Sequence, residues 1–500
     1  MLGTVDAIDE RTTPEAAAEE RDGEHAGPPE APVGPGVSIS SVVGLLLAIV
    51  GLRFGLDSLH DNSFFTHLAT GRLILDSGSI PRVDPYSFSA HGHAWTVQSW
   101  GASVIYAAIE RTVGLVGIRL LVGAISAALA VLVWKLTEPA EGLVGRLAIA
   151  VPVIAIGSGL WVERPLIFSL LFLVGVLFAL EGRLDPRWML PMLWLWVNVH
   201  GSFPLGLAAI VAYGLGRLLD RERPTLELRV FAWAAAGTVL GGVLSPVGID
   251  LLTFPFQLLS RREAFSQIVE WQPPTWGEPS ELFFAVQLAI AVGLIALRGR
   301  RWRNVVPVLL FAGLSLQSTR NIVQASLIMV PAMAVAARGL GSIDARATLP
   351  VLRPIRMALV ALAVVVAGIG LSRPDTNLVD YPVESAAWMR SHGLLDRDDR
   401  VVSRDFVGNY LEVRYGPERV QTYMDDRVDM FPLPVIADYT TLIDPEGDYA
   451  AVLDRARATA VLWDRDSGLG DWLEDPANGW RIVHRERLWL VAVPASAVPS

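Results

Sequence analysis

The chain has 500 residues and a formal net charge of −10, and 52% of its residues are hydrophobic while only 18% are charged. The mean hydropathy of +0.42 and apolar blocks long enough to cross a bilayer argue against a soluble protein and indicate a polytopic membrane protein. The lack of cysteine excludes disulfides, thiolate metal sites and a cysteine nucleophile, and the acidic residues gather towards the two ends, so the net charge does not point to nucleic acid.

The chain begins with a polar segment. Residues 1–37 are acidic and rich in proline, which is typical of a disordered tail and not of a signal peptide. We therefore expect a disordered cytoplasmic tail over residues 1–37, followed directly by an uncleaved first span.

Apolar blocks then predict about eleven membrane spans, which make up a transmembrane domain over residues 38–372. Several blocks are shorter than the usual ~20 residues. The predicted spans cover residues 40–57, 115–137, 145–161, 165–181, 188–199, 203–219, 229–246, 281–297, 304–318, 321–338 and 354–372.

The orientation follows from arginine and lysine, which collect in alternate loops, most clearly in "RLLDRERPTLELR" (217–229) and "RGRRWR" (298–303). Loops rich in these residues face the cytoplasm. This predicts a multi-pass protein of the cell membrane with a cytoplasmic N-terminus and an extracytoplasmic C-terminal segment. Arg53, near the outer end of the first span, is the exception to the pattern.

The interval 57–114 is predicted to form one long outer loop with two helices. Within it, "NSFFTHLATGRLIL" has the pattern of a capped amphipathic helix. A second helix over 97–113 is placed on the outer surface, with Glu110 and Arg111 towards water. A long loop with this much pattern is typical of a functional element.

After Arg373 the composition becomes that of a soluble protein, which predicts a small extracytoplasmic α/β domain over residues 373–500. The helical stretches are 384–393 and 448–457. The β-rich runs are "RVVSRDFVGNYLEVRY", "RVQTYMDDRVDMF", "TAVLWD" and "WRIVHRERLWLVAV".

The strongest catalytic candidate is Asp61, which follows the first span directly. A carboxylate at a rigid helix start, beside low-dielectric surroundings, suits a general base with raised proton affinity. His67, about one and a half helical turns later, is a second catalytic candidate. The structural alternatives are a helix cap for Asp61 and a hydrogen bond to a loop for His67.

A third catalytic candidate is Asp84 in "PRVDPYSF", which stands between two prolines in stiff backbone. It could act as a second acid or a cation ligand, and Asp-Pro is also a common turn starter. His91 and His93 have the spacing of metal ligands but lack a clear third ligand, so turn residues are favoured. Whether the protein needs a divalent cation is left open.

Two arginines open spans from the outer side, against the positive-inside trend. Arg164 in "WVERPLIF" and Arg320 in "LQSTRNIV" are therefore candidates for binding a phosphate through the planar guanidinium, with Asn321 beside Arg320. Pairing of Arg164 with Glu163, and contact with lipid headgroups, are the alternatives.

Two further polar groups have open roles. Asn198 and His200 lie in the tight outer turn of "WLWVNVHGSFPLG", where substrate hydroxyls or the neighbouring loop would satisfy their hydrogen bonds. In "MDDRVDMF", Asp425, Asp426 and Arg427 could contact a substrate, and an ion pair at a strand end is equally consistent with the sequence.

Taken together, these segments resemble the GT-C superfamily of membrane glycosyltransferases, especially the bacterial relatives of the protein mannosyltransferase and arabinosyltransferase group. The features that carry the resemblance are the first span followed by "HDNSFFTHLATG", the loop through "WTVQSW", the segments "ERPLIFSLLF" and "WVNVHGSF", and the tail beginning "VESAAWMRSHG". The resemblance covers roughly residues 38–340 and depends on order and placement more than on a sharp motif.

The resemblance implies a carboxylate at the reaction centre just after the first span, and a polyprenyl-phosphate sugar donor at the outer leaflet. By position Asp61 matches that carboxylate, Asp84 looks like the second loop acid of related enzymes, and Arg320 is similar to the late-span arginine that binds lipid phosphate. The chain departs from the group in one respect. His60, Asp61 and Asn62 stand where an Asp-Glu pair is usual, which leaves the identity of the base open.

We therefore expect a hexosyl- or pentosyltransferase of the cell envelope that uses a polyprenyl-phosphate sugar, with Asp61 as base and Arg320 as phosphate binder. The acceptor is left open among lipid, glycan and protein. A transporter or lipid flippase is the alternative from another class, and it would place charges at mid-depth and repeat broken helices in two halves. A non-catalytic assembly factor or sensor is the third reading.

Overall fold

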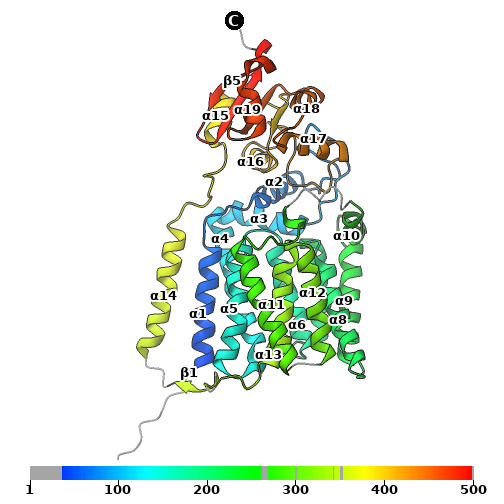
Figure 1. Ribbon diagram of the computed structural model, residues 1–500, viewed down its shortest axis with the longest axis vertical. Coiled ribbons are helices and arrows are strands. Elements are labelled where there is room, and N and C mark those ends of the chain that lie inside the picture. Colours follow the sequence, from blue (N-terminus) through cyan, green and yellow to red (C-terminus); the bar gives the residue numbers. More distant parts are fainter. Residues whose placement is uncertain (1–36, 262–268, 299–300, 342, 350–352, 498–500) are drawn as a thin grey trace, which may run out of the picture.

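The computed structural model describes residues 37–261, 269–298, 301–341, 343–349 and 353–497. The predicted tail over residues 1–37 therefore lies outside the described part except for Val37, where β1 (Val37–Ser38) begins. A bundle of helices forms one end of the molecule, and an α/β region (residues 375–497) forms the other (Figure 1). Two helices, α2 (Asn62–Ser77) and α3 (Trp100–Val113), lie across the end of the bundle beneath the α/β region.

Each sequence segment predicted to span the membrane coincides with a helix of the bundle. These helices are α1 (Ile39–Gly55), α4 (Leu115–Leu136), α5 (Leu143–Leu160), α6 (Leu166–Leu180), α7 (Met189–Val199), α8 (Phe203–Leu219), α9 (Thr225–Val243), α11 (Pro279–Arg298), α12 (Trp302–Gln317), α13 (Ile322–Ala336) and α14 (Arg353–Leu371).

Among the described residues, 5 helices are long and apolar enough to cross a membrane. They are Leu115–Ala140, Leu143–Leu160, Thr225–Val243, Pro279–Arg298 and Thr319–Ala336. Four bundle segments that are apolar but shorter are Ile39–Gly55, Leu166–Leu180, Phe203–Leu219 and Met357–Leu371. The fold is therefore that of a helical, multi-pass membrane protein, and the full count of spans remains a prediction.

The surface of the bundle is suited to lipid. Large apolar side chains are exposed along it, for example Leu218 on α8, Val243 on α9, Leu309 on α12 and Val364 on α14. A surface of this kind in water would favour aggregation, whereas hydrocarbon solvates it without cost.

Small residues let the first span approach its neighbour closely. A Cβ atom added to Gly55 of α1 would lie 2.2 Å from the backbone nitrogen of Gly123 on α4, and one added to Gly51 would lie 2.5 Å from the carbonyl oxygen of Ser126. Dense backbone packing is the usual basis of helix association in lipid. It fixes the end of α1 from which the Asp61 segment leaves.

A fully buried arginine fastens the same end. The Arg119 guanidinium on α4 donates to the backbone carbonyls of Leu56, Asp57 and Gly370, at 2.7, 3.1 and 2.5 Å, and to the Asp375 carboxylate at 2.9 Å. It thereby joins α1, α4 and α14, although α14 stands apart from the rest of the bundle in Figure 1. A buried charge is tolerated because its donors are paired.

The two helices across the bundle end are joined by ion pairs. Arg72 of α2 donates to Glu110 of α3 at 2.7 Å, and Arg111 donates to Asp76 at 2.5 Å. The expectation that Glu110 faces water is therefore wrong, whereas Arg111 is exposed as expected, with 42% of its side chain accessible. Packing α2 against α3 brings oppositely charged residues of the two helices together, and Glu110 is half-buried as a result.

The α/β region contains a four-stranded sheet in the order β3-β4-β6-β5, with β3 parallel to β4 and the other pairs antiparallel. Its strands are β3 (Val401–Ser403), β4 (Ala460–Asp464), β5 (Trp480–Arg485) and β6 (Trp489–Pro494). Its helices are α15 (Val383–Ser391), α16 (Asp405–Tyr415), α17 (Leu433–Ile443), α18 (Tyr449–Ala456) and α19 (Gly468–Glu474). A separate two-residue pairing of β1 (Val37–Ser38) with β2 (Thr348–Leu349) lies at the far end of the bundle (Figure 1).

One of the β-rich runs is largely helical. In "RVVSRDFVGNYLEVRY" only β3 is a strand, and the remainder forms α16. The buried side chains Val407, Tyr410 and Leu411 recur at helical spacing and cover one face. Burial of that face overrides the β-propensity of valine and tyrosine. "MDDRVDMF" likewise contains no named strand.

Candidate active site

Asp61 is the N-cap of α2, and its side chain is only 8% exposed. One carboxylate oxygen accepts a hydrogen bond from the Phe64 backbone N–H at 3.3 Å, and the other forms an ion pair with the Arg164 guanidinium. The capping role and the position beside a lone arginine are therefore both present. Asp61 is anchored by its cap and keeps one oxygen for its charged partner.

The segment around Arg164, between α5 and α6, locks onto the start of α2. The buried Glu163 carboxylate accepts hydrogen bonds from the backbone N–H groups of His60 and Asp61, at 2.5 and 2.7 Å. Glu163 therefore binds the backbone next to Asp61 and does not pair with Arg164. This contact sets the direction in which the Asp61 side chain points.

Arg164 lies between two carboxylates. Its guanidinium forms ion pairs with Asp61 and with Glu270, and 31% of its side chain remains exposed. Glu270 belongs to the short helix η3 (Val269–Trp271). We refer to Asp61, Glu163, Arg164 and Glu270 as the acid–arginine cluster.

The helix η3 also contacts the segment that carries Arg320, so Arg320 lies next to the acid–arginine cluster. Arg320 lies in η4 (Thr319–Asn321), and the Glu270 carbonyl oxygen accepts hydrogen bonds from the hydroxyls of Ser318 and Thr319 at 2.9 and 3.1 Å. The Arg320 guanidinium lies over the Trp271 ring, 5.2 Å from its centroid. Asp61 and Arg320 are thus joined by a continuous chain of contacts through Arg164 and Glu270.

Burial controls the charge of Asp61. It raises the pKa of Asp61 to about 6; Arg164 opposes the rise, and the charges of Glu163 and Glu270 add to it. For Glu270 burial also acts to raise the pKa, but Arg164 and Arg320 outweigh it, so the pKa is lowered. The cluster therefore contains one carboxylate that titrates close to neutral pH and one that stays ionised.

The two predicted histidines of the site are held in their neutral forms. The Nδ1 atom of His67 lies 3.1 Å from the Ser103 hydroxyl, and that of His200 lies 3.0 and 2.8 Å from the hydroxyls of Ser169 and Ser202. Burial lowers the pKa of His67 to about 4 and that of His200 to about 3. Nearby arginines contribute to both shifts: Arg164 to each, Arg320 to that of His200.

The two predicted asparagines hold the framework of the site. The Asn198 side chain accepts from the Trp100 indole N–H at 2.9 Å and donates to the carbonyls of Trp194 and Gly241. Asn321 donates to the Leu314 carbonyl at 3.1 Å. These bonds join α3, α7 and α9 in the first case and close the turn between α12 and α13 in the second.

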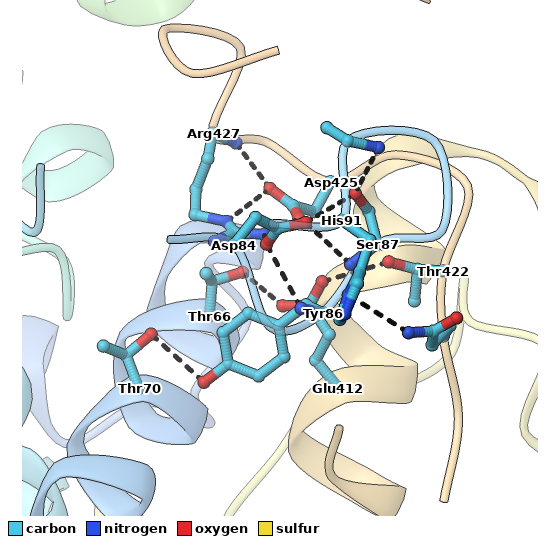
Figure 2. A network of polar contacts seen from close by, with 12 residues as sticks. Thr66, Thr70, Asp84, Tyr86, Ser87, His91, Glu412, Thr422, Asp425 and Arg427 are labelled. Atoms are coloured by element: carbon cyan, nitrogen blue, oxygen red, sulfur yellow. Dashed lines mark hydrogen bonds and ion pairs between the residues drawn. The ribbon is translucent and has the colours of Figure 1, made fainter. Parts of the chain in front are cut away.

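Asp84 lies apart from the acid–arginine cluster, in the buried network of Figure 2. Its carboxylate accepts from the hydroxyl and backbone N–H of Ser87, at 2.6 and 2.9 Å, and from Arg427 of the α/β region at 2.7 Å. Arg427 also donates to Asp425 at 2.8 Å. The Asp425–Arg427 ion pair is therefore present, and Asp84 joins the outer loop to it.

Asp426, between Asp425 and Arg427 in the chain, lies at the N-terminus of α2 and not in the network around Asp84. Its backbone N–H donates to the Asn409 side chain at 3.1 Å, and Asn409 donates to the Asn62 carbonyl in the first turn of α2 at 3.2 Å. The Asp426 side chain accepts a hydrogen bond from Ser63. A carboxylate of the α/β region therefore lies at the N-terminus of α2, beside Asp61.

The pKa of Asp426 is raised to about 7, first by burial and then by the charge of Asp425, with a further contribution from Asp61. Hydrogen bonding by Ser63 and the charge of Arg164 oppose the rise. The only sequence signal for a carboxylate at this position is the acidic character of "MDDRVDMF". It did not distinguish Asp426 from Asp425.

No group of three or more histidine, aspartate or glutamate side chains in the described part of the chain is arranged to hold a metal ion. His91 and His93 are exposed, and His91 lies 3.3 Å from the Gln421 side chain. Whether the protein needs a divalent cation, which the sequence left open, is a question for experiment.

No protein-family model and no curated protein matches the chain in sequence. Among solved structures, the oligosaccharyltransferase of Archaeoglobus fulgidus in its apo form matches with a TM-score of 0.52 and 12% identity, over 85% of this chain and 69% of that chain. The same enzyme, tethered to an acceptor peptide containing the NVT sequon, matches with a TM-score of 0.50 and 11% identity over the same shares.

The arabinofuranosyltransferase AftD from Mycobacteria also aligns, with 15% identity and a TM-score of 0.45, over 91% of this chain and 41% of that chain. Identities this low concern the fold. The chain shares the fold of the Archaeoglobus fulgidus oligosaccharyltransferase, which agrees with the resemblance inferred from the sequence.

Proposed function

We propose that the protein is a glycosyltransferase that moves a sugar from a polyprenyl-phosphate donor to an acceptor at the outer face of the cell membrane. The observation that carries the proposal is the acid–arginine cluster, in which a buried carboxylate with a raised pKa lies against an arginine and close to a second one. Perturbed acids beside specific cations are typical of catalytic sites.

In this reaction Asp61 takes the proton of the acceptor nucleophile as that atom forms a bond to the anomeric carbon of the sugar. The bond between the anomeric carbon and the phosphate oxygen breaks, and the phosphate leaves as an anion. A single displacement of this kind inverts the anomeric centre. The raised pKa of Asp61 supports the role, because a base with a pKa near the working pH is the most effective.

Arg320 is assigned to the departing phosphate. Its half-buried guanidinium is oriented by the Trp271 ring and joined to the cluster through η3 and η4. A planar cation matches two phosphate oxygens at once and stabilises the charge that develops as the bond breaks. Arg164 is assigned to orienting Asp61 and to adding positive charge from its exposed edge.

The remaining polar residues are assigned to substrate positioning. His67 and His200 are neutral at pH 7, so we assign them to hydrogen bonds with substrate hydroxyls and not to proton transfer. Asp426 is assigned to the acceptor side of Asp61. Asp84, Asn198 and Asn321 are assigned to holding the loop, the helices and the turn that carry the site.

For the topology we propose that all bundle helices with predicted spans cross the membrane. The N-terminus is then cytoplasmic, and the α/β region extracytoplasmic. The acid–arginine cluster lies at the bundle end that faces the α/β region, which is where a donor in the outer leaflet would present its phosphate. Acids gathered at one end of the bundle fit this function better than transport, which needs charges at mid-depth.

The test is to incubate purified full-length protein in lipid nanodiscs with a panel of radiolabelled polyprenyl-phosphate sugars, with and without a chelator. Release of sugar or its transfer from one donor supports the proposal. Movement of an intact donor across the membrane of proteoliposomes, without cleavage of the sugar–phosphate bond, would contradict it and favour a flippase. The chelator arm determines whether a divalent cation is required.

A further inference from the structure

A cavity lies between three parts of the chain, and none of the described residues that line it belongs to the acid–arginine cluster. It has a volume of about 320 Å³ and is bounded by the outer loop, by α10 (Asp250–Ser260) and by the Asp429–Met430 segment of the α/β region. In Figure 1, α10 lies at the end of α9, below α17. The volume falls within the usual range for small-ligand sites, about 300–1,000 Å³.

The lining divides into an apolar floor and a polar rim. Trp95, Val97 and Phe254 line the cavity and are buried. His93 and Gln257 also line it and are exposed. At the rim Asp250 supplies hydrogen-bond acceptors, while the amide and imidazole groups supply both donors and acceptors.

Two arginines hold the walls of the cavity together. Arg82 of the outer loop donates to the carbonyls of Pro246 and Val247 just before α10, at 2.6 and 2.9 Å. Arg261, directly after α10, donates to the carbonyls of Asp429 and Phe431 in the α/β region. The cavity is therefore formed by cross-linked segments and exists before a ligand arrives.

The cavity borders the proposed reaction centre. A Cβ atom added to Gly201, next to His200, would lie 3.7 Å from the ring of Phe254 in the cavity floor. Asp429, which lines the cavity, interacts electrostatically with Arg320. A ligand in the cavity would thus approach the cluster from the side of His200 and Arg320.

We infer that this cavity binds a carbohydrate chain as the acceptor, an inference that rests on the proposed glycosyl transfer. A sugar ring presents a C–H face to an apolar floor and a rim of hydroxyls that both donate and accept hydrogen bonds. The buried Trp95 and Phe254 supply the apolar surface, and the exposed His93, Asp250 and Gln257 supply the polar groups.

The same lining argues against the other acceptor classes. Asp250 lies 3.9 Å from Arg82, and Gln257 donates to Thr253 at 3.2 Å. An acyl chain would add no hydrogen bond to these groups or to His93, whereas sugar hydroxyls would. A polypeptide bound in extended form usually pairs with the edge of a sheet. None of the residues that line the cavity belongs to a strand named in the described part of the chain.

The test uses the full-length protein in nanodiscs and saturation-transfer NMR. The probes are linear tetrasaccharides of glucose, galactose, mannose, N-acetylglucosamine and arabinose, with two mixed-sequence octapeptides as the alternative class. The variant combines His93→Ala with Gln257→Ala, at two exposed positions where substitution is expected to leave the fold intact. The matched control is Ser260→Ala, an exposed residue on the same helix that does not line the cavity.

We expect at least one tetrasaccharide to bind, with affinity reduced about tenfold or more in the double variant and unchanged in Ser260→Ala. Absence of saccharide binding, equal binding by the double variant, or binding of the octapeptides alone would overturn the inference. The binding experiment and the transfer assay can also disagree. If the tetrasaccharides bind as expected but the protein transfers no sugar, the proposed function is overturned and the carbohydrate site is retained.

Discussion

The Arg164 guanidinium is ion-paired with the Asp61 carboxylate, although the two residues are 103 positions apart in the chain. The same guanidinium is ion-paired with Glu270. The carboxylates of Asp61 and Glu270 therefore share the positive charge of Arg164. The pKa of Asp61 depends on the charges of both neighbours, because Arg164 lowers it and Glu270 raises it. This dependence makes the proposed base testable through the pH profile of the reaction.

Removing the positive charge of Arg164 should move the rate–pH profile of sugar transfer to higher pH. With Asp61 as base, the transfer rate rises as pH increases through the pKa of about 6, because the carboxylate must be ionised. Arg164 lowers that pKa, so Arg164→Gln raises it, and the rate at pH 6 falls severalfold more than the rate at pH 8. A rate–pH profile of single-turnover transfer checks this, and an unmoved midpoint would contradict the role of Asp61.

Removing the negative charge of Glu270 should move the rate–pH profile of sugar transfer to lower pH. The Glu270 charge raises the pKa of Asp61, so Glu270→Gln lowers it and extends activity to lower pH. Because the two variants shift the midpoint in opposite directions, a general loss of structure cannot imitate the pair of results. Shifts of the same sign would show that another group titrates.

The backbone contact of Glu163 should be structural. Glu163→Ala removes the acceptor for the part-buried N–H group of His60 and the buried N–H group of Asp61, and should lower the free energy of unfolding by about 1–4 kcal/mol. Glu163→Gln keeps an acceptor oxygen and should lose much less. Thermal unfolding in detergent compares the two, and equal stability of both variants would show that the contact contributes little.

The elements of the bundle could be predicted from the sequence, but the partners in the site could not. Hydropathy located the helices because burial in lipid demands long apolar segments. The partner of Arg164 depends on which segments meet at the bundle end, and the adjacent Glu163 looked just as suitable. Asp426 reaches Asp61 only because Asn409 of α16 lies against α2, and that stretch had been assigned to a β-rich run.

The buried arginine at the end of the bundle should be essential for stability. Arg119→Met leaves the carbonyls of Leu56 and Asp57 without a donor and should cost about 2–6 kcal/mol, because each buried acceptor that loses its partner costs about 1–3 kcal/mol. The control is Arg111→Met, at a position with 42% of its side chain exposed. Thermal unfolding of both variants is the measurement, and equal midpoints would contradict the account.

The Asp84–Arg427 ion pair should hold the outer loop to the α/β region. Both side chains are buried, so Asp84→Ala leaves Arg427 with only Asp425 as a carboxylate partner and should increase hydrogen exchange in the loop around Ser87 and in the segment around Thr422. The pH midpoint of transfer should stay unchanged, because Asp84 lies outside the acid–arginine cluster. A shifted midpoint would instead support the assignment of Asp84 to proton transfer.

The most direct test of the central claim is the transfer rate of Asp61→Asn in the nanodisc assay, with Asp76→Asn as its control. Asp76 lies on the same helix, with 69% of its side chain exposed. We predict that Asp61→Asn folds and binds donor but loses transfer by about 10²-fold or more, the usual contribution of a general base, while Asp76→Asn retains the wild-type rate. Undiminished transfer by Asp61→Asn would contradict the proposed mechanism.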